Sequence, residues 1–145
     1  MAERILSEVL DTLWRSYATT APMMHVGVKH EMTDFGMKMS QGDVCQKLQP
    51  VPLNKARAQQ DDSPLTRQEL AAFTGLLAGL LWLCQTRLGA IAYTVIIRQN
   101  TQSATIKHIK MANTLLARVK KYSEGVGIYF PKLTPPFVID TVADS

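Results

Sequence analysis

The 145-residue sequence has few cysteines and few histidines, and neither residue type occurs at a spacing that would support catalysis or metal binding. The cysteines, Cys45 and Cys84, form no CxxC or other metal-binding spacing, so reduced thiols in a cytoplasmic or nuclear protein are expected. The three histidines, His25, His30 and His108, are scattered. No phosphate-binding glycine loop, HExxH motif or GxSxG motif is present. The residues therefore indicate no active site of a known type.

Long apolar runs are also missing, although residues 75–97 are strongly apolar and open on a GxxxG spacing. A membrane-spanning helix needs about 18 to 20 apolar residues. The first apolar segment ends near Cys84, the second covers only residues 88–97, and Arg87 would lie at the bilayer midplane of the joined pair. We therefore expect no membrane partner. The stretch instead predicts two buried helices that pack closely through three small residues, Gly75, Ala78 and Gly79.

The N-terminal residues 1–22 lack the uninterrupted apolar segment of a signal peptide, because acidic residues divide them. Their apolar side chains recur at helical spacing, at Ile5, Leu6, Val9, Leu10 and Leu13. The polar face is mostly acidic, which disfavours binding along a membrane surface. This segment predicts a helix that packs on the core.

The remaining patterns predict an α+β fold: a small β-hairpin, then a helical bundle, then one or two C-terminal strands. Residues 25–41 alternate around a TDFG turn, with Val26 and Val28 expected on one face. Thr66 and Glu69 form a capping box that begins an apolar helix. Helices are predicted over residues 66–84, 88–97 and 105–122, and strands at VGIYF and FVIDTV. The predicted domain organisation is 1–50, a linker at 51–65, a helical unit at 66–124, and a C-terminal part at 125–145.

The linker contains the adjacent acidic pair Asp61 and Asp62. Paired carboxylates are suited to Mg²⁺, but these two lie in a polar, proline-bounded segment that supplies no rigid frame. The pattern therefore predicts a solvated loop.

The third predicted helix has no acidic residue between positions 104 and 121. At about 100° per residue, four basic residues fall within an arc of about 80° opposite the apolar side. They are Lys107, Lys110, Arg118 and Lys121. A basic stripe without local acidic partners suits contact with a phosphate backbone, and a plain solvated face is the alternative. The net charge of +4 and pI of about 9.2 also suggest an acidic partner.

Several motifs, in order, resemble the reverse transcriptase of copia-type retrotransposons. FTGLLAGLLWLCQTRLGAIAY, at residues 73–93, is similar to the segment that follows the palm, although Thr74 replaces the usual Arg, and Gly89 and Ala90 replace Pro-Asp. HVGVKHEMTDFGMKMSQ resembles the family's strand, turn and strand, and TIKHIKMANTLLARVKK resembles its helix with an Ala-Asn-x-Leu-Leu core. GIYFPKLTPPFVIDTVADS resembles the entry to the RNase H domain.

The resemblance, over about residues 22–145, implies the end of the palm, a thumb-like helical unit and the first strand of an RNase H domain. Asp144 occupies the position of the first Mg²⁺-binding carboxylate of RNase H, and Asp140 is the weaker candidate. The Tyr-x-Asp-Asp pair that holds the polymerase metals is not in this chain. We therefore expect no complete metal site and no cofactor in this chain, while the intact family enzyme uses Mg²⁺. We also expect neither polymerase nor RNase H activity from this polypeptide alone.

Two functions follow as hypotheses. The first is a non-catalytic piece of a retrotransposon polyprotein, whose basic helix contacts the backbone of an RNA–DNA hybrid or DNA independently of sequence. Its other expected partner is the remainder of the polyprotein, and its expected location is the cytoplasm or nucleus. The second is a non-enzymatic protein-interaction module. Its partner surface would comprise Leu76, Leu80, Leu83, Ile96 and their neighbours.

Overall fold

The computed structural model describes residues 21–123 and 125–132, and these residues have the predicted α+β fold. The described residues divide into two compact units, one comprising residues 21–39 and 129–132, the other residues 40–123 and 125–128. The predicted N-terminal helix and the strand predicted at FVIDTV lie outside the described residues. The domain boundaries predicted at 50, 65 and 124 remain predictions.

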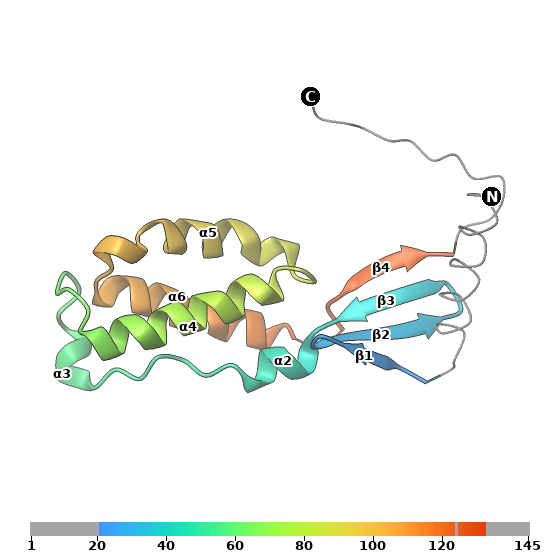
Figure 1. The fold of residues 1–145 in the computed structure, drawn as a ribbon, viewed down its shortest axis with the longest axis horizontal. Coiled ribbons are helices and arrows are strands. Elements are labelled where there is room, and N and C mark those ends of the chain that lie inside the picture. Colours follow the sequence, from blue (N-terminus) through green and yellow to red (C-terminus); the bar gives the residue numbers. More distant parts are fainter. Residues whose placement is uncertain (1–20, 124, 133–145) are drawn as a thin grey trace, which may run out of the picture. The chain divides into compact units, whose positions relative to one another are not determined.

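Four strands form an antiparallel sheet in the order β1-β2-β3-β4 (Figure 1). Their bounds are Met23–His25 for β1, Val28–Thr33 for β2, Gly36–Ser40 for β3 and Ile128–Pro131 for β4. The predicted hairpin is confirmed as β2 and β3, which the TDFG turn joins and in which Thr33 Oγ1 donates to the Gly36 carbonyl at 2.9 Å. Gly36 has a φ of +139°, and a Cβ there would overlap the Phe130 carbonyl of β4. Only glycine lets β4 approach this closely.

A second hairpin, β1 with β2, was not predicted, and the expectation that Val26 and Val28 share one face is wrong. Val26 and Gly27 form a two-residue turn, because His25 pairs with Val28. Their φ values are 46° and 76°, and positive φ at both central residues suits the right-handed twist of a hairpin. Val26 is therefore exposed at the turn, while Val28 is buried. A β-branched residue is rare at positive φ, so the local sequence indicated a strand here instead.

The second unit is helical, and its elements are α2 (Gly42–Lys47), α3 (Lys55–Ala58), α4 (Arg67–Leu83), the 3₁₀ turn η1 (Leu88–Ala90), α5 (Ile91–Gln99), η2 (Thr101–Ser103) and α6 (Ile106–Lys121). The three predicted helices are confirmed as α4, α5 and α6. These three pack against one another (Figure 1). Their core includes six large, fully buried side chains: Phe73, Leu80, Leu83, Ile106, Ile109 and Leu116.

The prediction that the helices pack through Gly75, Ala78 and Gly79 is wrong. Gly75 and Ala78 face solvent, and a Cβ at Gly75 would meet nothing within 4 Å. A Cβ at Gly79 would lie 2.5 Å from the Leu48 side chain, which follows α2, so this glycine accommodates the segment after α2. The buried face of α4 carries its larger side chains at helical spacing: Phe73, Leu76, Leu77, Leu80 and Leu83. In water, burying the large apolar side chains of a helix stabilises its packing more than bringing small residues of two helices close together does.

Asp61 and Asp62 are exposed, as expected of a solvated loop, but the expectation that the linker at 51–65 supplies no rigid frame is wrong, because hydrogen bonds anchor this segment. Asn54 caps α3 by accepting from the Arg57 backbone N–H at 2.7 Å. The carbonyls of Asp61 and Ser63 accept from the backbone N–H groups of residues 107 and 106, at 3.0 and 3.2 Å. These bonds hold Asp61 beside the first turn of α6.

Arg57 also holds the start of α4. Its guanidinium donates to both carboxylate oxygens of Glu69, each at 2.9 Å, and Glu69 accepts from the Thr66 backbone N–H at 2.8 Å. The Thr66 hydroxyl in turn accepts from the Glu69 N–H, which confirms the predicted capping box. The hydrogen bonds from Arg57 and then from Thr66 lower the pKa of Glu69 from 4.5 to about 2.

We expect Glu69→Gln to lower the free energy of unfolding at pH 7 by about 1 kcal/mol, because glutamine keeps the cap but loses the ion pair. The folded carboxyl has the lower pKa, so its stabilisation is present above pH 4.5 and is lost as the pH falls towards 2. Urea unfolding of both proteins between pH 7 and pH 2 should therefore show curves that converge in acid. A difference that stays constant with pH would contradict this assignment.

Candidate nucleic-acid interface

Helix α6 is amphipathic and buries one side against α4 and α5. Its buried residues are Ile106, Ile109, Ala112, Leu115, Leu116 and Val119. The helix begins at Thr105, whose backbone N–H donates to Nδ1 of His108 at 3.1 Å. Because the apolar side faces the core, the opposite side must face solvent.

The four predicted basic residues, Lys107, Lys110, Arg118 and Lys121, are exposed on that solvent side, and we call them the basic stripe. The fifth basic residue of α6, Lys120, lies apart from them. It is half-buried, and its Nζ donates to the Gln46 carbonyl at 3.0 Å. Lys120 therefore ties α6 to α2 and contributes less to the solvent-facing charge.

One member of the stripe has an acidic partner from outside the helix. Lys110 Nζ lies 2.6 Å from the Asp61 carboxylate, a partner 49 residues away that spacing within the helix does not reveal. The two side chains are 45% and 51% exposed, so water screens the pair and it contributes little to stability. Lys110 therefore exchanges this partner for another anion at small cost.

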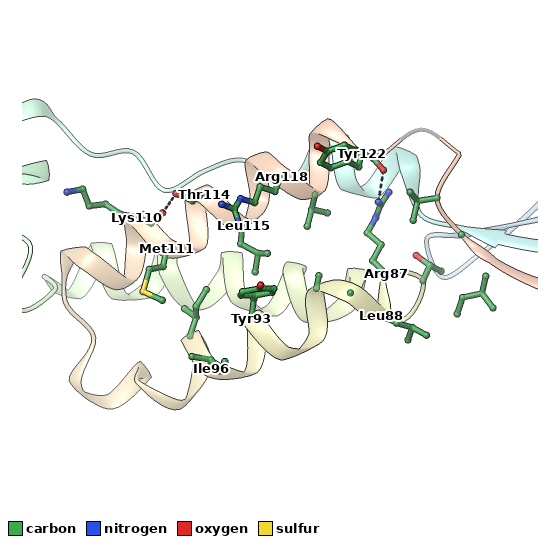
Figure 2. A pocket seen from close by; sticks show the side chains of 18 of the residues that line it. Arg87, Leu88, Tyr93, Ile96, Lys110, Met111, Thr114, Leu115, Arg118 and Tyr122 are labelled. Carbon is green, nitrogen blue, oxygen red and sulfur yellow. Dashed lines mark hydrogen bonds between the residues drawn. The ribbon is translucent and has the colours of Figure 1, made fainter.

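A groove with a cavity volume of about 820 Å³ runs between α5 and α6 beside the stripe (Figure 2). Lys107, Lys110 and Arg118 line its edge. The side chains of Tyr93 and Leu115 point into the space between the two helices (Figure 2). This α5–α6 groove thus combines cationic groups with an apolar and aromatic lining.

At one end of the groove, the Arg87 side chain is buried to 6% exposure. Its Nη1 donates to the Tyr122 carbonyl at 3.3 Å (Figure 2). Its Nη2 donates to the Ser123 carbonyl at 3.2 Å. These carbonyls end α6, where a cation is favoured by the helix dipole. Arg87 therefore joins the α4–α5 connection to the C-terminal end of α6. The sequence contains no local signal for this role, since the partners are 35 and 36 residues away.

A second buried polar contact lies at the same connection. Thr86 Oγ1 lies 2.8 Å from the side-chain amide of Gln41, which is 1% exposed. With the Gln41 nitrogen facing Thr86, its oxygen accepts from Trp82 Nε1 at 3.0 Å. Both contacts bring residues at the end of α4 to the residue that precedes α2.

Neither cysteine is placed for chemistry. Cys45 and Cys84 are free and buried. Burial raises the pKa of the Cys45 thiol, and the nearby charges of Arg87 and Lys120 lower it in part. Both thiols are therefore expected to be unreactive.

The candidate metal carboxylates Asp144 and Asp140 lie outside the described residues. Within residues 21–123 and 125–132, no three His, Cys, Asp or Glu side chains gather as metal ligands would. In the same ranges, no helix combines the length and hydropathy that a membrane crossing requires.

The surface predicted for a protein partner is largely wrong, because Leu76, Leu80 and Leu83 are buried in the core. Only Ile96, at 52% exposure, is accessible. Five of this unit's exposed apolar side chains are grouped instead on η1 and α5, at Leu88, Ile91, Tyr93, Val95 and Ile96, while others lie on or beside α4 and α6. Apolar residues occur on most sides of α5, so its sequence alone does not reveal which face is buried.

No protein-family model, no curated protein and no solved structure matches this chain. The resemblance to copia-type reverse transcriptases rests on the sequence motifs described above.

Proposed function

We propose that this chain is the palm-end and thumb-like part of a reverse transcriptase similar to those of copia-type retrotransposons, and that it binds a nucleic-acid backbone without catalysing a reaction by itself. The observation that carries the proposal is the basic stripe, four cations on the exposed side of α6. A helix with this distribution of charge presents a positively charged side to an anionic polymer.

The length of the stripe suits such a partner. From Lys107 to Lys121 the helix advances by about 21 Å at 1.5 Å per residue. A nucleic-acid strand carries a phosphate about every 3.4 Å along its axis, so the stripe reaches about six phosphates. Lysine and arginine contacts to phosphates carry no direct sequence information, so binding is independent of sequence. The resemblance implies an RNA–DNA hybrid or DNA as the anionic polymer.

The dependence of binding on salt tests this proposal. Anisotropy of a fluorescent RNA–DNA hybrid should give an association constant whose logarithm falls with the logarithm of salt concentration, with a slope of about −3 to −4 if all four cations meet phosphates. Two hybrids of unrelated sequence should bind alike. An association constant that does not change with salt concentration, or no binding at low salt, would contradict the proposal.

A protein-interaction module is the second candidate, favoured by the exposed apolar side chains of α5. Tyr93 and Ile96 are both more than half exposed on this helix. Light scattering over a range of concentrations distinguishes the two functions. A mass that rises with concentration and returns to the monomer in Ile96→Asp favours the second candidate, whereas a monomer at every concentration argues against self-association.

A further inference from the structure

We propose that the α5–α6 groove receives the unpaired bases of a single-stranded nucleic acid whose phosphates lie along the basic stripe. This inference rests on the proposed function of the stripe. It adds that this surface prefers a single-stranded nucleic acid to a duplex. The ligand class follows from the groove itself, which places aromatic rings and cations on the same surface.

Two tyrosines, one on α5 and one directly after α6, supply the aromatic surface. Tyr93 of α5 is 57% exposed, and Tyr122, directly after α6, is 64% exposed. Both line the groove, together with the half-exposed side chains of Ile96 and Met111. Exposed rings cost free energy in water unless a ligand covers them, and a nucleobase offers a flat surface that stacks on them.

The charges around these rings match a polyanion. Lys107, Lys110 and Arg118 line the same groove, and Asp61 is the one carboxylate among its lining residues. Lys121 Nζ lies 5.4 Å from the centre of the Tyr122 ring, which places another cation beside an exposed aromatic face. Cations that follow a backbone beside rings that stack on bases are typical of single-strand binding sites.

A duplex would leave the groove unused. In a duplex the bases stack on each other and pair in the interior, so only phosphates would contact this surface. A single strand can place its bases on Tyr93 and Tyr122 while its phosphates remain on the stripe. The cavity volume of about 820 Å³ lies within the range of sites that bind small organic groups.

The direct test compares strands that have the same phosphates but differ in their bases. Fluorescein-labelled oligothymidylate of about 12 nucleotides, an abasic strand of equal length, and an RNA–DNA hybrid are titrated with the whole chain. We expect the thymidylate strand to bind about tenfold more tightly than the abasic strand, since stacking is the only difference between them. It should also bind more tightly than the hybrid.

Tyr93→Leu should weaken thymidylate binding about tenfold and leave abasic binding unchanged, because it removes the ring and keeps an apolar side chain. Tyr129→Leu is the matched control, as Tyr129 is 59% exposed on β4, and it should change neither affinity. Thermal unfolding verifies that both variants fold. The comparison of strands uses the unchanged protein, so it stands even if Tyr93→Leu is unstable.

The outcomes separate this inference from the proposed function. Equal, salt-dependent affinities for thymidylate and abasic strands, or tighter binding of the hybrid, overturn the inference and leave backbone binding intact. No binding to any nucleic acid overturns both. If the two strands bind equally and a labelled acidic amphipathic peptide binds in a Tyr93-dependent manner, the groove belongs to a protein partner and the inference fails.

Discussion

Replacing the whole basic stripe with glutamine is expected to lower affinity for an RNA–DNA hybrid by about several thousandfold at 0.1 M salt. Each cation that meets a phosphate releases about 0.9 counterion, which is worth nearly tenfold in affinity at this salt concentration, and four contacts multiply. The variant carries Lys107→Gln, Lys110→Gln, Arg118→Gln and Lys121→Gln. Because all four side chains are exposed, the fold should be retained. Anisotropy titrations should also show the salt slope approaching zero.

A second fourfold variant separates local contact from net charge. Lys47→Gln, Lys55→Gln, Arg67→Gln and Arg98→Gln also remove four exposed cations from the helical unit, away from the stripe. The net charge falls from +4 to 0 in both variants, since each loses four positive charges. The control should lose well under tenfold in affinity, through weaker long-range attraction alone. Equal losses in the two variants would show that net charge, not the stripe, governs binding.

Replacing Arg87 with methionine is expected to lower the free energy of unfolding by about 2 to 4 kcal/mol. Methionine fills much of the space of the arginine stem but cannot donate to the carbonyls of Tyr122 and Ser123. The end of α6 then loses two charged hydrogen bonds and a cation favoured by the helix dipole. Urea unfolding at neutral pH measures the change.

The control for Arg87 is Arg98→Met, because Arg98 is exposed near the end of α5. This change should alter the free energy of unfolding by about 0.5 kcal/mol or less. If Arg87→Met is as stable as the unchanged protein, then the cost of burying the guanidinium offsets its hydrogen bonds. The Arg87 contacts would in that case orient the end of α6 without stabilising the fold.

Elements specified by local patterns were predictable. The capping box of Thr66 and Glu69 marks the start of α4, and the period of apolar residues marks the buried side of α6. The position of the basic stripe follows from the same period, because a helix that buries one side exposes the other. The TDFG turn likewise located β2 and β3.

Features that depend on distant partners were not predictable. The glycine spacing of α4 suggested helix pairing, but the larger side chains on another face bury more apolar area. Helix α5 has apolar residues on most sides, so its own periodicity does not show that Thr94 and Ile97 face the core while Tyr93 and Ile96 face solvent. Packing against α4 and α6 decides that orientation.

The sequence by itself determined the α+β class, the three helices α4, α5 and α6, and the charge that α6 presents, because caps, turns and hydrophobic periods act over a few residues. Only the tertiary structure decided that Asp61 meets Lys110, that Arg87 ends α6, and that a groove lies beside the stripe. These contacts join residues far apart in the chain. Their partners are selected by how the helices pack, which no local pattern encodes.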